Sequence, residues 1–193
     1  MKLLLIIFIS LSFINASNPS IEKWVIEKNS VFSIEGKSNV APYLCKTSQY
    51  MKNDTILIIR DENETKPVYF QGGLKLMVKW FDCGQQFMTK EMQKTLKADK
   101  RPEMKINLVS LAGSQKHGHT VKGIVDVEIA GISKRIDINF DVKKPRSTSL
   151  CFIGKKHLKF SDFNLVPPEK LAGLVKVEQD ILVKFEINMR SAH

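Results

Sequence analysis

Histidine and cysteine, which commonly bind metals or act as base and nucleophile, are few in this 193-residue sequence, which has four His and three Cys. His117 and His119 are the closest pair, and alternate positions of a strand share one face, so two imidazoles could bind one metal ion. However, Gly118 and the polar residues around it predict a turn at 115–119, and no third ligand stands nearby in the sequence. We therefore interpret both as surface histidines and expect no metal site.

Sequence patterns of acyl and phosphoryl transfer are also missing. The chain has neither a G-x-S-x-G motif nor a Gly-rich phosphate loop. Its Asp and Glu residues fall at the polar positions of alternating segments, which gives no support to a pair of catalytic carboxylates. We expect no catalytic residues and interpret the chain as a binding protein rather than an enzyme. A metal-dependent enzyme that uses His117 and His119 is a less favoured alternative.

The three cysteines are Cys45, Cys83 and Cys151. In an oxidising compartment they predict one disulfide and one remaining thiol, and their spacing does not choose among the three pairings. A bridge between Cys45 and Cys83 would close a loop worth about 4 kcal/mol in the chain-entropy description. No CxxC occurs, and no His stands near Cys45 or Cys83, so a zinc site is not expected.

The first sixteen residues have the pattern of a secretory signal peptide. Lys2 precedes an apolar run at 3–13, and Ile14-Asn15-Ala16 resembles a cleavage site. The run is shorter than the roughly 20 residues that span a bilayer, and no later segment is apolar enough to do so. We expect residues 1–16 to be removed, 17–193 to form a single domain, and the product to be periplasmic or secreted.

The chain is basic, with 30 Lys and Arg against 20 Asp and Glu and a net charge of +10. A positive charge can attract nucleic acid, anionic lipid or acidic polymers. Here the lysines are scattered over the polar faces of predicted strands, and no stripe of basic and aromatic residues is present. We expect no nucleic-acid partner.

Alternation of apolar and polar residues dominates the rest of the chain and predicts β-strands. In residues 135–143, Ile136, Ile138, Phe140 and Val142 take one face and charged or polar residues take the other. Similar segments recur to give about eight strands, and Ala130-Gly131 predicts a hairpin turn. The apolar face of each strand must be covered, either by a second sheet or by closure into a barrel. The pattern does not decide between these architectures.

One segment departs from the strand rhythm and predicts the single helix. Met88, Met92 and Leu96 recur every four residues, which places them on one side of a helix at about 88–98. Thr89 is the candidate N-cap, and Pro102 follows the predicted end.

The sequence resembles the YceI-like family from about Trp24 to Met189. The resemblance is carried by segments that occur in the family's order: 24–27 with 30–32, the helix region 81–106 with its Leu-Lys-Ala ending and following Pro, the hairpin 123–134, and the final strands at 160–163 and 175–185. It implies an antiparallel, lipocalin-like β-barrel of about eight strands with the helix near the barrel mouth.

The resemblance also implies a function. Family members are exported and bind a long isoprenoid or a similar lipid inside the barrel. Burial of each CH₂ contributes about 0.8 kcal/mol, so an apolar chain binds without a catalytic group or a cofactor. The expected partner is thus a lipophilic small molecule. An interaction or structural protein with a filled barrel core is the alternative, and the sequence leaves open whether the protein forms a homodimer.

Ten residues are candidates for the walls of a lipid pocket, because they lie on the apolar faces of the predicted strands and helix. They are Phe32, Ile34, Met88, Met92, Leu96, Ile106, Phe140, Phe152, Phe163 and Phe185. Asn29 and Ala130 occupy positions where many family members have His, which implies a different head group or none. Cys45 and Cys83 resemble cysteines found in some relatives and suggest that a disulfide pins the helix at the entrance.

Overall fold

The computed structural model describes residues 19–192 except 48–49, 64, 113–119 and 171. His117, His119 and the predicted signal peptide lie outside these residues. The described part contains the helix α1 (Gln86–Thr95), the short 3₁₀ helices η1 (Val78–Trp80) and η2 (Phe160–Phe163), and thirteen strands. The strands are β1 (Ser20–Ile26), β2 (Val31–Ser38), β3 (Pro42–Thr47), β4 (Thr55–Arg60), β5 (Val68–Gly72), β6 (Leu74–Met77), β7 (Phe81–Asp82), β8 (Glu103–Leu111), β9 (Thr120–Ile129), β10 (Ile132–Arg146), β11 (Ser149–Lys159), β12 (Glu169–Lys170) and β13 (Val175–Ser191).

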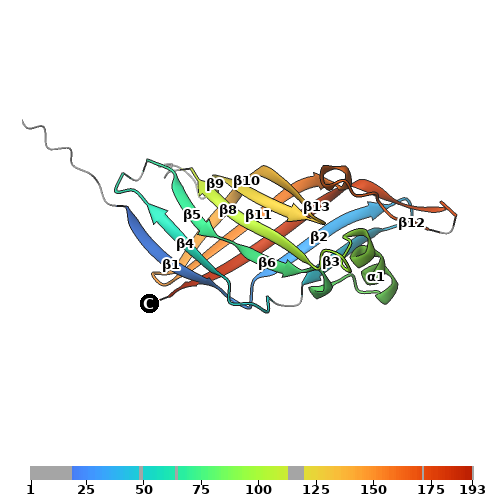
Figure 1. Ribbon diagram of the computed structural model, residues 1–193, viewed down its shortest axis with the longest axis horizontal. Coiled ribbons are helices and arrows are strands. Elements are labelled where there is room, and N and C mark those ends of the chain that lie inside the picture. Colours follow the sequence, from blue (N-terminus) through green and yellow to red (C-terminus); the bar gives the residue numbers. More distant parts are fainter. Residues whose placement is uncertain (1–18, 48–49, 64, 113–119, 171, 193) are drawn as a thin grey trace, which may run out of the picture.

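Antiparallel pairing closes eight of these strands into a ring. The order is β1-β4-β5-β8-β9-β10-β11-β13, and β13 pairs again with β1 through Trp24 and Ser191. Figure 1 shows the ring as an elongated barrel with α1 at one end, which we call the mouth. Closure satisfies the edge strands that an open sheet would expose. The prediction of an antiparallel, lipocalin-like barrel of about eight strands with one helix is therefore confirmed.

The barrel has a seam between β1 and β2, which both pair with the 17-residue strand β13. At the seam, the Ser30 hydroxyl donates to the Asn188 carbonyl at 3.2 Å and accepts from the Asn188 amide at 3.0 Å. These bonds keep the backbone groups of Asn188 on β13 paired at the gap between the end of β1 and the start of β2. Beyond the seam, β2 pairs with β3 and β3 with β7, which extends the wall towards the mouth.

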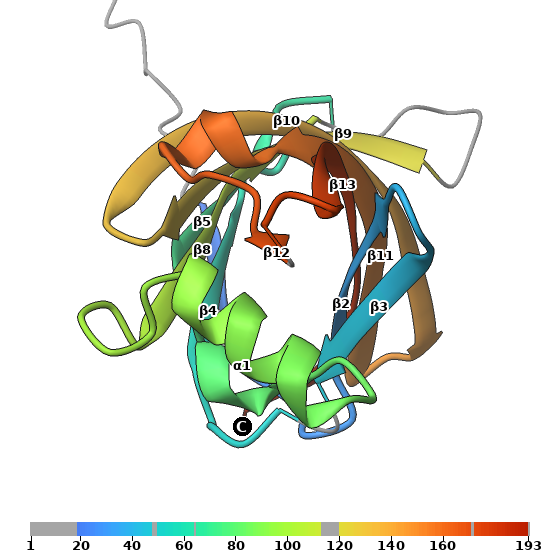
Figure 2. The same cartoon turned by 90° about the vertical axis from the view of Figure 1, so that its right-hand side faces the viewer.

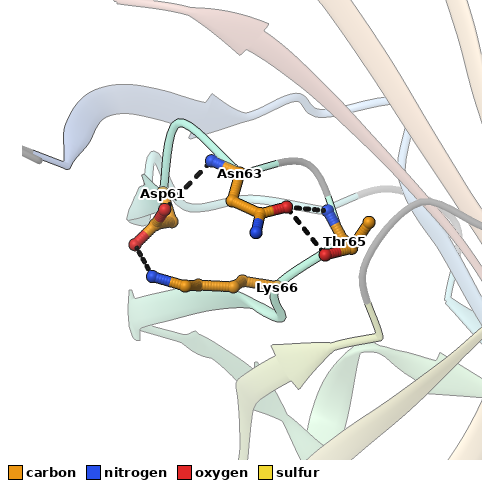
Figure 3. A network of polar contacts seen from close by, with 4 residues as sticks. All are labelled: Asp61, Asn63, Thr65 and Lys66. Carbon is orange, nitrogen blue, oxygen red and sulfur yellow. Dashed lines mark hydrogen bonds and ion pairs between the residues drawn. The ribbon is translucent and has the colours of Figure 1, made fainter.

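Turn chemistry follows the sequence at two hairpins. Ala130 and Gly131 both have positive φ, 52° and 86°, as the predicted tight turn between β9 and β10 requires. The second turn follows β4, at the end of the barrel opposite the mouth. The Asn63 side-chain oxygen accepts hydrogen bonds from the backbone amide and the hydroxyl of Thr65 (Figure 3). Asp61 accepts the Asn63 amide and forms an ion pair with Lys66 at 2.8 Å. Such Asx contacts stabilise the turn after β4 locally.

The helix differs in detail from its prediction. It runs from Gln86 to Thr95 rather than over 88–98, because Lys97 adopts a left-handed conformation with φ 55° and ends it. The N-cap is Gln85, so the assignment of Thr89 as N-cap is wrong. The Thr89 hydroxyl instead accepts the Cys83 amide at 3.0 Å, which ties the first turn of α1 to the end of β7.

Candidate functional site: a pocket under the helix and a cavity in the barrel

A pocket of about 350 Å³ lies beneath α1 at the barrel mouth, and we call it the helix pocket. Figure 2 looks into this end and shows α1 on one side of the opening and β12 near its centre. Most of the walls come from α1, the β2–β3 hairpin and the first half of β13, and η2 and β12 add Phe160 and Lys170. The wall residues from α1 are Met88, Met92 and Leu96, and those from the strands include Tyr43, Val177 and Ile181.

The spacing on α1 explains how the helix presents its apolar side. Met88, Met92 and Leu96 follow one another at intervals of four residues, so they stack along the side that faces the pocket. Leu96 is buried and the two methionines are partly buried, whereas Lys90 and Lys94 are exposed. Methionine is flexible and polarisable, so this side of α1 can adapt its shape.

A disulfide between Cys45 and Cys83 links the segment just before α1 to β3. This is the pair that the family resemblance suggested. Both cysteines are buried and both line the helix pocket, and Cys83 stands three residues before the helix begins. The third cysteine, Cys151, is buried and has a free thiol.

The short strand β12 contributes Lys170 to the wall of the helix pocket. Lys170 forms an ion pair with Glu91 at 2.7 Å, and its ammonium lies 5.6 Å from the centre of the Phe87 ring. Lys170, Glu91 and Phe87 all line the helix pocket. One ion pair and one cation–π contact therefore join α1 to β12, which in turn pairs with β13.

A second space, the inner cavity, lies within the barrel and measures about 90 Å³. Its walls are almost entirely apolar and include six of the predicted pocket residues, namely Phe32, Ile34, Ile106, Phe140, Phe152 and Phe185. Ile34 also lines the helix pocket, so this side chain borders both spaces. Lys156 is the one Lys among the lining residues.

Aromatic rings fill much of the barrel around the inner cavity. Phe140 packs against Phe152 and Phe185 with ring centres 5.9 and 5.5 Å apart. Gly123 and Gly154 make room for these rings, since a Cβ atom at Gly154 would lie 2.3 Å from Phe185 and one at Gly123 would lie 2.6 Å from Phe140. The larger space is therefore at the mouth rather than in the middle of the barrel.

The structure brings nine of the ten predicted residues to the wall of the helix pocket, the inner cavity or both. Phe163 is the exception: it is 2% exposed, belongs to η2 and lines neither space. Sequence reasoning missed the wall residues at the start of β13, Val175 and Val177. They alternate in phase with Ile181 and lie within the final strand that the family resemblance gave as 175–185, so the signal that could have found them was present.

Tyr50, in the segment that connects β3 to β4, was also missed. Its side chain is fully buried, with its ring 6.3 Å from that of Phe32 and 5.8 Å from that of Trp80. Its hydroxyl donates to Asp54, whose carboxylate accepts the Lys75 amide at 2.9 Å. Burial, followed by the bond to Asp54, raises the pKa of Tyr50 above its ordinary value.

Tyr43, on the wall of the helix pocket, is similarly affected. Burial raises the pKa of Tyr43 to about 12, and the nearby charge of Glu178 adds to the shift. The phenol is therefore neutral at physiological pH and adds no charge to the pocket.

Within the described ranges, no group of three or more His, Cys, Asp or Glu side chains is arranged to hold a metal ion. Nor does that part of the chain contain a helix with the length and apolar composition needed to cross a membrane.

Comparisons with known proteins place the fold. No protein-family model matches the chain, and no curated protein matches its sequence. Among solved structures, Burkholderia cenocepacia BcnA is 16% identical with a TM-score of 0.58, covering 82% of this chain and 95% of its own. A polyisoprenoid binding domain from Saccharophagus degradans, implicated in plant cell wall breakdown, is 8% identical with a TM-score of 0.59 and covers 90% of this chain and 100% of its own. The Campylobacter jejuni YceI protein is 18% identical with a TM-score of 0.52, covering 75% of this chain and 84% of its own. The chain thus has the fold of YceI and polyisoprenoid-binding proteins.

Proposed function

We propose that this chain is an exported member of the YceI-like family that binds an isoprenoid or another lipophilic chain without catalysing a reaction. The observation that carries the proposal is the apolar helix pocket, which shares the Ile34 side chain with the inner cavity. The fold of the Saccharophagus domain, which is described as binding polyisoprenoid, supports this choice of ligand class. The Cys45–Cys83 disulfide supports export to an oxidising compartment.

The two volumes indicate where the ligand binds. An apolar cavity of about 150 Å³ holds one benzene molecule, so the inner cavity of about 90 Å³ is too small for a prenyl chain with its walls as they stand. The helix pocket, at about 350 Å³, falls within the range of small-molecule sites. We place most of the ligand under α1, with its end at Ile34. A longer chain enters the barrel only if the Phe rings rotate.

The driving force is burial of the apolar ligand against Met88, Met92, Leu96 and the β13 side chains. Each buried CH₂ contributes about 0.8 kcal/mol, and part of this gain is offset by ordering the ligand. The charged residues that line the helix pocket are Glu91 and Lys170, which pair with each other. An anionic head group would compete with Glu91 for Lys170.

The test begins with the ligand that the protein carries. Mass spectrometry of an organic extract of the purified protein is expected to find a lipophilic compound in stoichiometric amount. In the variant Met92→Asp, a carboxylate enters the apolar wall, and we expect the bound amount to fall at least about tenfold because burying an unpaired charge is costly. Gln86→Asp adds the same charge to the same helix at an exposed position and should keep the ligand.

A second candidate function, an interaction protein with a filled barrel, is favoured by the Phe140, Phe152 and Phe185 packing. It predicts an extract without stoichiometric lipid and no saturable binding of added isoprenoid alcohol. That outcome, or equal ligand content in Met92→Asp and Gln86→Asp when both are folded by circular dichroism, would overturn lipid binding under α1.

A further inference from the structure

Exposed apolar side chains gather at the barrel mouth. Four of the five most exposed large apolar residues in the described part of the chain are Val40, Phe87, Val166 and Leu174, with exposed fractions of 71%, 60%, 80% and 73%. We call these four residues the apolar rim. They belong to the β2–β3 turn, α1, the loop after η2 and the turn after β12, all of which lie at the end viewed in Figure 2.

Hydrogen bonds hold part of the apolar rim in place. The Asn39 side chain donates to the Leu174 carbonyl at 2.8 Å and accepts the Lys176 amide at 2.9 Å. These bonds tie the turn that carries Val40 to the turn that carries Leu174. Val40 and Phe87 also line the helix pocket, so the rim is continuous with the entrance to that pocket.

Positive charge surrounds the apolar rim. The segments 37–42, 86–102 and 164–178 contain eight Lys and Arg against four Asp and Glu, a net charge of +4. Two of the four acids are already in ion pairs, Glu91 with Lys170 and Glu169 with Lys176. Lys90 and Lys94 follow Phe87 by three and seven residues, so their exposed side chains lie on the same side of α1 as that ring.

We propose that the barrel mouth docks on a membrane surface that contains anionic phospholipids. The apolar rim inserts at the level of the head groups, and the surrounding lysines contact lipid phosphates. Exposed apolar side chains with lysines in the neighbouring segments match the apolar and anionic groups of such a surface. The same charge opposes docking of two copies mouth to mouth, since both faces are positive.

The docking proposal extends the proposed function, because a ligand could then pass between bilayer and helix pocket without crossing water. Docking itself requires only the rim and the lysines. Failure of lipid binding under α1 would therefore leave docking standing, and the two are measured separately.

The experiment is co-sedimentation of the intact purified protein with vesicles of phosphatidylcholine alone or mixed with phosphatidylglycerol. We expect binding to the mixed vesicles that weakens as salt rises, because salt screens the lysines. Leu174→Asp combined with Val166→Asp should lower the partition coefficient at least about tenfold, which corresponds to about 1.4 kcal/mol. Neither residue lines the helix pocket, so the affinity of the purified variant for added isoprenoid alcohol should stay unchanged.

Matched controls test the place of the effect. Ile21 of β1 is 62% exposed and pairs in register with Ile59, beside the turn after β4 and away from α1; Ile21→Asp should not affect sedimentation. Lys90→Glu with Lys94→Glu should weaken binding to mixed vesicles, whereas Lys144→Glu on β10 should not. Equal binding to both kinds of vesicle, equal loss in Ile21→Asp, or a rim variant that alters only the oligomeric state would overturn the proposal.

Discussion

Tyr50 is a buried phenol whose ionisation is coupled to folding. Because its pKa is raised in the folded chain, its contribution to stability is complete below about pH 10, where the unfolded phenol titrates, and is lost as the pH rises further. We predict that Tyr50→Phe lowers the free energy of unfolding by about 1–3 kcal/mol at neutral pH, since it removes the bond to Asp54. The free energy of unfolding of Tyr50→Phe should also fall less steeply with pH above pH 10, as measured by urea unfolding.

Tyr43 also has a raised pKa, so the variant should keep part of this pH dependence, and Tyr69→Phe, at an exposed position, is the control. Equal slopes in Tyr50→Phe and the unchanged protein would contradict the prediction.

At the residue scale, the sequence identifies side chains whose position follows from periodicity. Phe140 and Phe185 lie on regular strands, so alternation alone predicts that they point inwards. Phe163 and Tyr50 could not be placed in this way. Phe163 belongs to a 3₁₀ helix, and Tyr50 stands between strands and is positioned by tertiary contacts with Phe32 and Trp80.

Two ties of very different strength hold α1 over the pocket. The disulfide closes a separation of 38 residues, which the chain-entropy description values at about 4 kcal/mol. The partly exposed ion pair between Lys170 and Glu91 is worth only about 0–1 kcal/mol. We predict that Cys45→Ala with Cys83→Ala lowers the free energy of unfolding by about 4 kcal/mol, and that Lys170→Ala lowers it by no more than about 1 kcal/mol. Urea unfolding with and without reductant is the measurement. Cys151→Ala should remain sensitive to reductant, and equal effects of the two ties would refute the ranking.

At the scale of elements, long regular segments were predictable and short or interrupted ones were not. The strand β10 and the turn at Ala130-Gly131 follow directly from alternation and turn chemistry. The structure around η1 does not follow from the sequence, because residues 74–80 alternate like a strand and yet bend at Val78 into a 3₁₀ turn. The end of α1 depends on the backbone conformation of Lys97, which no capping residue in the sequence announces.

At the scale of the molecule, alternation establishes that each strand has one apolar face but not how those faces are covered. A sandwich and a barrel need the same pattern. The choice is made by the pairing of β1 with β13, which joins residues at opposite ends of the chain. The resemblance to the YceI-like family, which extends over most of the sequence, supplied the closed architecture that the pattern left open.

The closed barrel limits the volume of the inner cavity, and a substitution at Phe152 should increase that volume. Phe152 packs between Phe70 and Phe140, with ring centres 6.2 and 5.9 Å away, and borders the inner cavity. Phe152→Ala should lower the free energy of unfolding by about 3–5 kcal/mol. It also enlarges the inner cavity, so added isoprenoid alcohol should raise the melting temperature of this variant more than that of the unchanged protein. Phe163→Ala removes an equally buried ring that borders neither space, and it should lose stability without this extra response to ligand. A ligand response that is the same in both variants, measured by thermal unfolding across a ligand titration, would show that the space inside the barrel takes no part in binding.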